Sequence, residues 1–465
     1  MHNPLPRLLI LLCVCFALIS PVSAQTADGP IYIVQPGDSL YSIAARFNIS
    51  IDALMAANNL TDPDLLAAGQ RLIIPGLEGV TGILNSEIIN FGDSFRSLVR
   101  RTGVPVDLLR RLNHLVSPTE FYVGASMIIP QDAEAPPMAG IVPTAGESLF
   151  ELAIRQGSDA WTLKELNDLG GTWDGLPGDV LYTPGDESSQ PATGLPPAFI
   201  SAEIKGLPLK QGGTGVIFVK TAPDVNLSGA LIDIPLHFFN LEDGTNVALQ
   251  GVHALLQPGA YPLRLDAALP DGSSQSYEQM MLVVSGNYRS EVIPLNDPAT
   301  IDPAVTEPEL QLIQSLISQS PSDRYWSTIF AAPAAYPDCY TSRFGTRRTY
   351  KVTNTQIQIP GFHTGLDFCG GEGLAITAPA PGRVIFAQPL TVRGNATIID
   401  HGWGVYSGFW HQSEFRVQVG DIVEQGQLIG LVGGTGRVTG AHLHWEIWVN
   451  GVQVDPLDWL AAAYP

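Results

Sequence analysis

The chain has 465 residues, of which 45% are hydrophobic and 15% are charged, and its formal net charge is −21. This composition excludes a disordered chain, and 47 Gly and 37 Pro without a triplet period exclude collagen. The acidic excess, with no basic run, argues against a nucleic-acid partner, because phosphate binding needs clustered Lys and Arg.

The N-terminus has the pattern of a secretory signal peptide. Arg7 precedes an apolar run at 8–18, and the Val-Ser-Ala of residues 22–24 is typical of a cleavage site. We therefore predict a signal peptide at 1–24 and a secreted protein, extracellular or cell-wall associated. The alternative is an uncleaved anchor, but the run is short for a membrane span. We expect no stable membrane insertion after signal cleavage.

Three copies of one module follow the signal peptide. The Gly-Asp-Ser of residues 37–39 recurs at 92–94, and as Gly-Glu-Ser at 146–148, with offsets of 55 and 54. Within each copy the periodicity predicts a strand, two helices and a strand, with the serine as the cap of the first helix. Two further landmarks keep the same offsets, namely Asn58, Asn113 and Asn167, and Pro75, Pro130 and Pro184.

The first copy resembles the LysM module, which binds N-acetylglucosamine-containing glycans of peptidoglycan and chitin. The resemblance rests on YIVQPGDSL at 32–40, NNL at 58–60 and IIP at 73–75. It implies a LysM repeat at 30–76 and LysM-like repeats at 84–130 and 139–185. The later copies depart from the pattern, so they either bind glycan or act as spacers. The resemblance implies glycan binding by Gly37, Asp38, Ser39, Leu40 and Asn58, for which a turn with a helix cap and no ligand is the alternative.

Residues 198–293 are predicted to form an Ig-like β-sandwich. Short alternating apolar runs are separated there by Gly, Asp and Pro, with no helical period. The isolated His237 and His253 are expected to be structural. Residues 294–335 form a predicted linker with one helix at about 308–318.

Chemistry-bearing residues concentrate in the last region, 336–465, where the pattern predicts glycine-rich strands. His442 and His444 are two apart in a predicted strand, so both imidazoles lie on one face. His363 and Asp367 are four apart, which is about 13 Å in an extended chain, so a shared ion requires the bend that Gly365 permits. Together these pieces predict a metal centre.

The ligand set of this centre is left partly open by the residues alone. Three N or O ligands with one open position are typical of catalytic zinc, whereas closed four-ligand sites are structural. Strict alternation would place Cys369 on the face of Asp367, so a thiolate ligand is one alternative. The other is a disulfide with Cys339, because two cysteines outside the signal peptide in an oxidising compartment favour one bond over two free thiols.

The C-terminal region resembles the lysostaphin-type zinc endopeptidases, which cut peptide bridges of peptidoglycan. The match runs from about 336 to 460 and rests on SRFG at 342–345, HTGLD at 363–367, APAPG at 378–382, IDHG at 399–402, YSGFWH at 406–411, GGTG at 433–436 and GAHLHWE at 440–446. It implies Zn²⁺ ligands at His363, Asp367 and His444, and catalytic residues at His411 and His442. His401 matches a position without a catalytic role.

We therefore expect a multidomain protein with N-terminal α+β LysM repeats (βααβ), a central Ig-like β-sandwich and a C-terminal, mostly antiparallel β peptidase domain. The expected function is a secreted zinc-dependent endopeptidase that hydrolyses peptide bonds of peptidoglycan and is held on the cell wall by LysM repeats. The alternative is a non-catalytic peptidoglycan-binding protein that activates another wall hydrolase. A glycan hydrolase would need a pair of acidic residues in a cleft, and no convincing pair is found.

Overall fold

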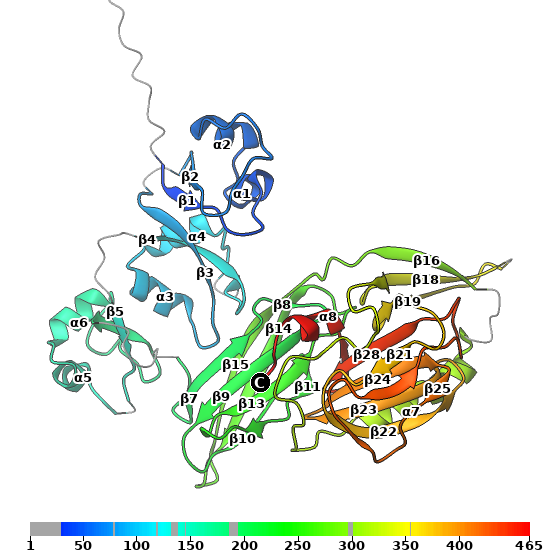
Figure 1. The fold of residues 1–465 in the computed structure, drawn as a ribbon. Coiled ribbons are helices and arrows are strands. Elements are labelled where there is room, and N and C mark those ends of the chain that lie inside the picture. Colours follow the sequence, from blue (N-terminus) through cyan, green and yellow to red (C-terminus); the bar gives the residue numbers. More distant parts are fainter. Residues whose placement is uncertain are drawn as a thin grey trace, which may run out of the picture. The chain divides into compact units, whose positions relative to one another are not determined.

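The computed structural model describes residues 29–77, 80–117, 120–131, 138–144, 146–185, 194–295, 301–353 and 355–465 (Figure 1). The expected signal peptide lies outside these residues, as does the linker segment 296–300. The described residues form two compact units according to their contacts. Unit 1 contains the described residues up to Asn85 together with residues 130–131, and unit 2 contains all the others. No helix in the described part of the chain is long and apolar enough to cross a membrane.

In each repeat, the landmark asparagine ties the second helix to the last strand. Asn58 donates from Nδ2 to the carbonyls of Leu54 and Ile73, and its Oδ1 accepts from the Ile73 amide. Asn113 and Asn167 make the same three bonds in their own repeats, so the constant sequence spacing reflects one hydrogen-bond pattern. The elements are β1 (Ile31–Ile33), α1 (Leu40–Arg46), α2 (Ile51–Ala57), β2 (Arg71–Ile73), β3 (Ile83–Ile88), α3 (Phe95–Thr102), α4 (Val106–Leu112), β4 (Ser126–Gln131), β5 (Met138–Ile141), α5 (Leu149–Arg155), α6 (Ala160–Leu166) and β6 (Leu181–Pro184).

The central domain consists of two β-sheets around one apolar core. The strand orders are β11-β10-β14-β15-β8 and β12-β13-β9-β7. Buried side chains from both sheets, such as Ile217 and Leu263, belong to one hydrophobic cluster. The strands are β7 (Phe199–Lys205), β8 (Leu209–Lys210), β9 (Thr214–Thr221), β10 (Asn226–Leu231), β11 (Ile234–Pro235), β12 (Phe239–Asn240), β13 (Asn246–Gly251), β14 (Gly259–Ala268) and β15 (Ser274–Val284).

The stretch that follows contains one strand and one helix. β16 (Ser290–Leu295) pairs in parallel with β18 (Arg347–Val352), so this segment joins the C-terminal domain rather than either sheet of the central domain. α7 (Pro303–Ile317) begins after its N-cap Asp302, which is earlier than the predicted start near 308. Proline is favoured at the first helical position, and Pro303 occupies it, whereas Pro308 lies inside the helix.

The C-terminal domain is predominantly β and is built on one large sheet. Its order is β17-β20-β28-β24-β23-β22-β26, and β29 pairs with β28. A second sheet has the order β21-β27-β25. The elements are β17 (Tyr340–Ser342), β19 (Gln358–Phe362), β20 (Leu366–Phe368), β21 (Ala375–Thr377), β22 (Gly382–Leu390), β23 (Gly394–Gly402), β24 (Val405–Gln412), β25 (Glu414–Phe415), β26 (Ile422–Val423), β27 (Leu428–Leu431), β28 (Leu443–Val449), β29 (Val452–Val454) and α8 (Pro456–Ala461).

Candidate metal centre and active site

The strand register brings the first two candidate ligands together. β20 pairs antiparallel with β28, and Asp367 stands directly opposite His444. Side chains at opposed positions of an antiparallel pair lie on the same face. The Asp367 Oδ1 to His444 Nδ1 distance is 2.7 Å, and both side chains are buried.

His363 reaches the same point through a bend between β19 and β20. Its Nε2 lies 3.0 Å from Asp367 Oδ1 and 3.1 Å from His444 Nδ1. Gly365 allows this bend by lacking a side chain, not by a left-handed backbone. A Cβ at Gly365 would lie 2.7 Å from His444 Nε2 and closer still to the Trp445 carbonyl oxygen, so any other residue would push the bend away from β28.

The three donors fit a metal ion. Their ligand atoms all lie within 4.8 Å of one another. Bonds of about 2.0 Å to a tetrahedral zinc would place neighbouring donors about 3.3 Å apart, close to the separations found here. The described contacts also fix the ring nitrogens, because His363 Nδ1 donates to the Arg343 carbonyl at 3.0 Å and leaves Nε2 for an ion. His444 offers Nδ1.

Glu446 supports the centre, and the sequence analysis gave it no role. His444 Nε2 donates to Glu446 Oε1 at 3.1 Å, and this carboxylate also accepts from Thr364 Oγ1 and from Gln453 Nε2. Glu446 is only 2% exposed. It follows His444 by two residues in β28 and therefore shares its face, which is the signal that could have identified it.

The centre concentrates negative charge in a buried place. Burial would lower the pKa of His444, but Asp367 and Glu446 beside it raise that pKa to about 9. Burial would raise the pKa of Asp367, yet the charge of His444 and the hydrogen bond from it hold that pKa well below its ordinary value. The carboxylate is therefore ionised and held ready for a cation.

The two predicted catalytic imidazoles flank these ligands. His411 Nδ1 donates to the Thr435 carbonyl and His442 Nδ1 to the Gly440 carbonyl, both at 2.8 Å, so each Nε2 can accept a proton. The His411 and His442 ring centroids are 5.2 Å apart, and His442 Nε2 lies 3.6 Å from Asp367 Oδ1. His411 has a φ of 65°, an unusual backbone conformation of the kind that clusters at active sites. Burial and the charge of His444 lower the pKa of His411 to about 3.

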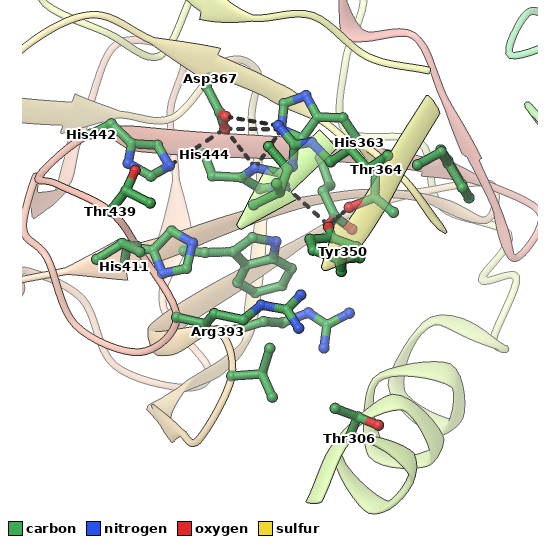
Figure 2. A pocket seen from close by; sticks show the side chains of 18 of the residues that line it. Thr306, Tyr350, His363, Thr364, Asp367, Arg393, His411, Thr439, His442 and His444 are labelled. Carbon is green, nitrogen blue, oxygen red and sulfur yellow. Dashed lines mark hydrogen bonds and ion pairs between the residues drawn. The ribbon is translucent and has the colours of Figure 1, made fainter. Parts of the chain in front are cut away.

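All five residues line one cavity of about 360 Å³ (Figure 2). Figure 2 shows His363, Asp367, His442 and His444 on one side, with Arg393 on the side toward α7. The linker contributes to the walls through β16 and α7. The other lining residues are Ile293, Thr306, Leu310, Arg348, Tyr350, Phe362, Thr364, Val392, Arg393, Trp410, Arg437, Val438, Thr439 and Glu446.

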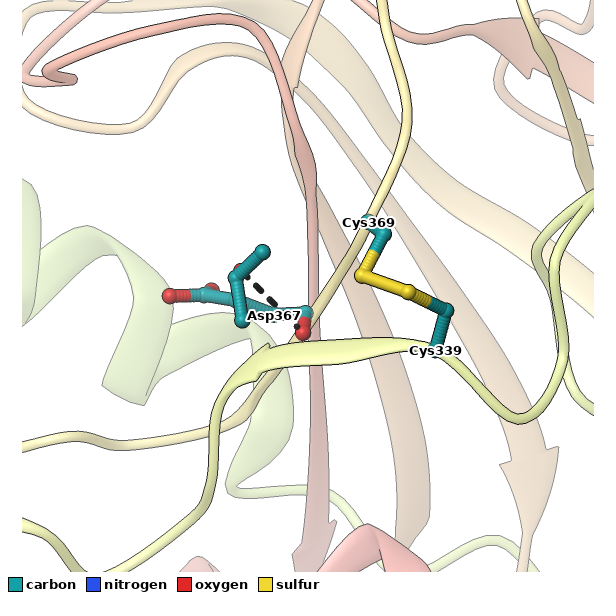
Figure 3. The surroundings of a disulfide bond; sticks show 4 residues. Cys339, Asp367 and Cys369 are labelled. Carbon is teal, nitrogen blue, oxygen red and sulfur yellow. Dashed lines mark hydrogen bonds between the residues drawn. A yellow bond between two sulfur atoms is a disulfide. The ribbon is translucent and has the colours of Figure 1, made fainter.

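Two further predictions near the metal centre concern Cys369 and His401. Cys339 and Cys369 form a disulfide beside Asp367, so Cys369 offers no thiolate to a metal (Figure 3). His401 is fully buried, donates from Nδ1 to the Pro381 carbonyl and accepts at Nε2 from Ser407 Oγ. His401 does not line the cavity, as expected for a structural histidine.

The candidate glycan-binding residues of the first repeat are engaged within the repeat itself. Gly37 takes a φ of 90° in a turn, and Asp38 Oδ2 accepts from Tyr32 Oη and from the Gln35 amide. Ser39 caps α1 in a capping box, and Leu40 is buried. The Asn58 amide bonds to backbone groups. These contacts match the turn-and-cap alternative, and glycan binding by these side chains stays a prediction.

The large β-sheet thus carries a His-Asp-His donor set that fits a metal ion. Residues 361–456 match the model of peptidase family M23, and residues 32–75 and 88–130 match the LysM domain. The chain thus contains LysM domains and a C-terminal peptidase M23 domain.

The following relatives are each similar to a part of the chain. It is 39% identical over 116 residues to the peptidoglycan DD-endopeptidase ShyC of Vibrio cholerae, covering 25% of this chain and 26% of the relative. It is 41% identical over 95 residues to the DD-carboxypeptidase/endopeptidase Mpg of Neisseria meningitidis, covering 20% and 22%. The chain thus spans about a quarter of the length of these relatives. The catalytic domain of lysostaphin from Staphylococcus simulans aligns at 32% identity over 22% of this chain and 81% of that domain, with a TM-score of 0.21.

Proposed function

We propose that this protein is a secreted zinc-dependent endopeptidase that hydrolyses peptide bonds of peptidoglycan. The observation that carries the proposal is the convergence of His363, Asp367 and His444 in one cavity with two further imidazoles, His411 and His442. The similarity to proteins named peptidoglycan DD-endopeptidases supports the same substrate class. All five ligand and catalytic positions that the lysostaphin-type resemblance implies hold a histidine or aspartate here. A non-catalytic wall protein is therefore the weaker alternative.

The donor set suits zinc, which favours imidazole nitrogen and carboxylate oxygen. His363 would bind through Nε2, Asp367 through Oδ1 and His444 through Nδ1. When bound, zinc supplies a Lewis acid at the scissile carbonyl and activates water at neutral pH. His411 and His442 would perform the proton transfers, because the carbonyls that accept from their Nδ1 leave Nε2 as the ring nitrogen that can take up and release a proton. Each such step contributes about 10²- to 10⁴-fold.

The upstream modules would bring the enzyme to its substrate. The LysM repeats would hold the protein on peptidoglycan glycan strands, and several weak sites on one chain would increase avidity. The signal peptide at 1–24 would direct it to the cell wall or the extracellular space, and the two central sheets would form an Ig-like sandwich. These assignments rest on the sequence patterns and on the LysM matches.

The test is mass spectrometry of muropeptides after digestion with the purified protein. We expect release of cleaved peptides, loss of release with a chelator, and recovery when zinc is added back. His444→Ala should lose zinc and activity together, whereas His442→Ala should keep zinc and lose about 10²-fold or more in rate. His237→Ala, an exposed histidine of the central domain, is the matched control. Cleavage that survives both chelation and His444→Ala would overturn the proposal, and binding without cleavage would favour the non-catalytic alternative.

A further inference from the structure

Three arginines line the active-site cavity of a chain whose net charge is −21. Arg348, Arg393 and Arg437, here called the arginine wall, stand in a cavity whose acidic lining residues are Asp367 and Glu446. Both acids belong to the candidate metal centre, where a divalent ion would offset their charge. The wall thus places three guanidinium groups in the cavity, of which those of Arg348 and Arg393 are each paired with a glutamate outside its lining.

Arg393 is held in place by aromatic and acidic partners. Its guanidinium lies over the Trp410 ring, 5.3 Å from the centroid. The buried Glu309 of α7 accepts from Arg393 Nη1 at 2.8 Å and from the backbone amides of Val392 and Arg393. Arg393 Nε is buried and has no hydrogen-bond partner among the described residues. The Trp410 ring and Glu309 therefore fix the position of this guanidinium.

Arg437 is positioned in a similar way from the loop before β28. Its guanidinium lies over the Tyr350 ring, 5.3 Å from the centroid, and its backbone amide donates to the Val392 carbonyl at 2.8 Å. Burial and the neighbouring Arg393 and Arg348 lower the pKa of Arg437. Like charges that line one cavity favour an anion between them. Arg348 is fixed by Glu291 and Ser342, which accept from it at 2.7 and 2.9 Å.

The same two loops orient His411. The His411 amide donates to the Arg393 carbonyl at 2.9 Å, and His411 Nδ1 donates to the carbonyl of Thr435, two residues before Arg437. An anion bound by Arg393 and Arg437 would therefore lie beside the imidazole proposed to move protons. Figure 2 shows Arg393 and His411 as neighbours on this side of the cavity.

We propose that the arginine wall binds an ionised carboxylate on the residue next to the cleaved bond, and that Arg393 and Arg437 make the enzyme select peptides that carry one. The planar guanidinium fork matches a carboxylate in two parallel hydrogen bonds, and such charge-assisted bonds are the strong ones. The inference rests on the proposed endopeptidase function and narrows its substrate class. The carboxylate is a free α-carboxylate or an acidic side chain.

Paired synthetic peptides separate these sources. One pair differs by a free or amidated C-terminus, and a second pair by a carboxylate or carboxamide side chain beside the cleaved bond. With zinc-loaded protein we expect kcat/KM to favour the carboxylate member of one pair by about 10- to 100-fold. Arg437→Gln and Arg393→Gln should bring this ratio close to one, mainly through KM. Arg416→Gln removes an exposed arginine outside the cavity and should keep the ratio.

A structural role for the arginines would lower the rate for both members of each pair and leave the ratio unchanged, and that result would overturn the inference. Equal cleavage of both members by the unaltered protein would overturn it as well. Zinc content and thermal unfolding of each variant identify those that fail to fold. If no peptide is cleaved, the proposed function fails, and peptide affinities measured by calorimetry still test the wall, because the same 10- to 100-fold preference should appear in Kd.

Discussion

Glu446→Gln tests whether the metal centre depends on the acceptor behind His444. Glu446 Oε1 accepts from His444 Nε2 at 3.1 Å and from Thr364, while Oε2 accepts from Gln453 at 3.0 Å. A glutamine keeps one acceptor but loses the charge, and its NH₂ group would face the NH₂ group of Gln453. Glu446→Leu removes every acceptor and leaves the His444 N–H buried without a partner.

The expected loss follows from what the carboxylate does. Removing a hydrogen-bond partner of a metal-ligating histidine typically weakens metal binding by 10- to 100-fold, or about 1.4–2.7 kcal/mol. Because glutamine retains an acceptor, we expect about 10-fold for Glu446→Gln and about 100-fold for Glu446→Leu. The measurement is zinc affinity by competition with a chromophoric chelator, at a pH where the protein is folded.

Glu414→Gln is the control, because Glu414 is an exposed carboxylate paired with Arg416. Its zinc affinity should equal that of the unaltered protein. If Glu446→Leu also binds zinc normally while remaining folded, then His444 does not need the carboxylate to present Nδ1. The assignment of ring nitrogens at the centre would then be wrong.

Two further predictions concern stability. Burial lowers the pKa of His401 from 6.5 to about 4, so the unfolded chain takes up this proton at a higher pH than the folded protein does. The contribution of His401 to the free energy of unfolding therefore falls by about 3 kcal/mol as pH drops from about 6.5 to about 4. Denaturant titrations across this range should show a smaller fall for His401→Gln, and an identical fall would contradict the buried, neutral imidazole. Replacing Cys339 and Cys369 by serine opens a loop with a sequence separation of 30 and should lower the free energy of unfolding by about 3–4 kcal/mol. A loss below about 1 kcal/mol in denaturant titration would contradict that estimate.

Patterns within one segment were informative in the sequence because they reflect local geometry. The offsets of Asn58, Asn113 and Asn167 each express a helix tied to a strand 15 residues later. The two-residue spacing of His442 and His444 predicted a common face, and the cavity contains both. The Gly365 bend was also expected, although its reason is the missing Cβ rather than backbone freedom.

Features that depend on distant segments had no such signal. Residues 290–295 continue the alternating pattern of the central domain, yet β16 pairs in parallel with β18 more than 50 residues later. Parallel pairing has no tight turn to announce it. The arginine wall joins residues from β18 and from the loops before β23 and β28, which become neighbours only when the large sheet forms.

The face behind the metal centre explains how short strands can hold ligands with precision. Side chains alternate along β28, so His444 and Glu446 face the cavity while Trp445 faces the opposite side. Trp445 and its cross-strand partner Leu366 belong to a buried cluster that includes Val247 and other residues of the central domain. The central domain therefore packs against the back of the strands whose front carries Asp367 and His444. Ligands on such a packed sheet keep their positions before an ion arrives, which is the preorganisation that a catalytic metal site requires.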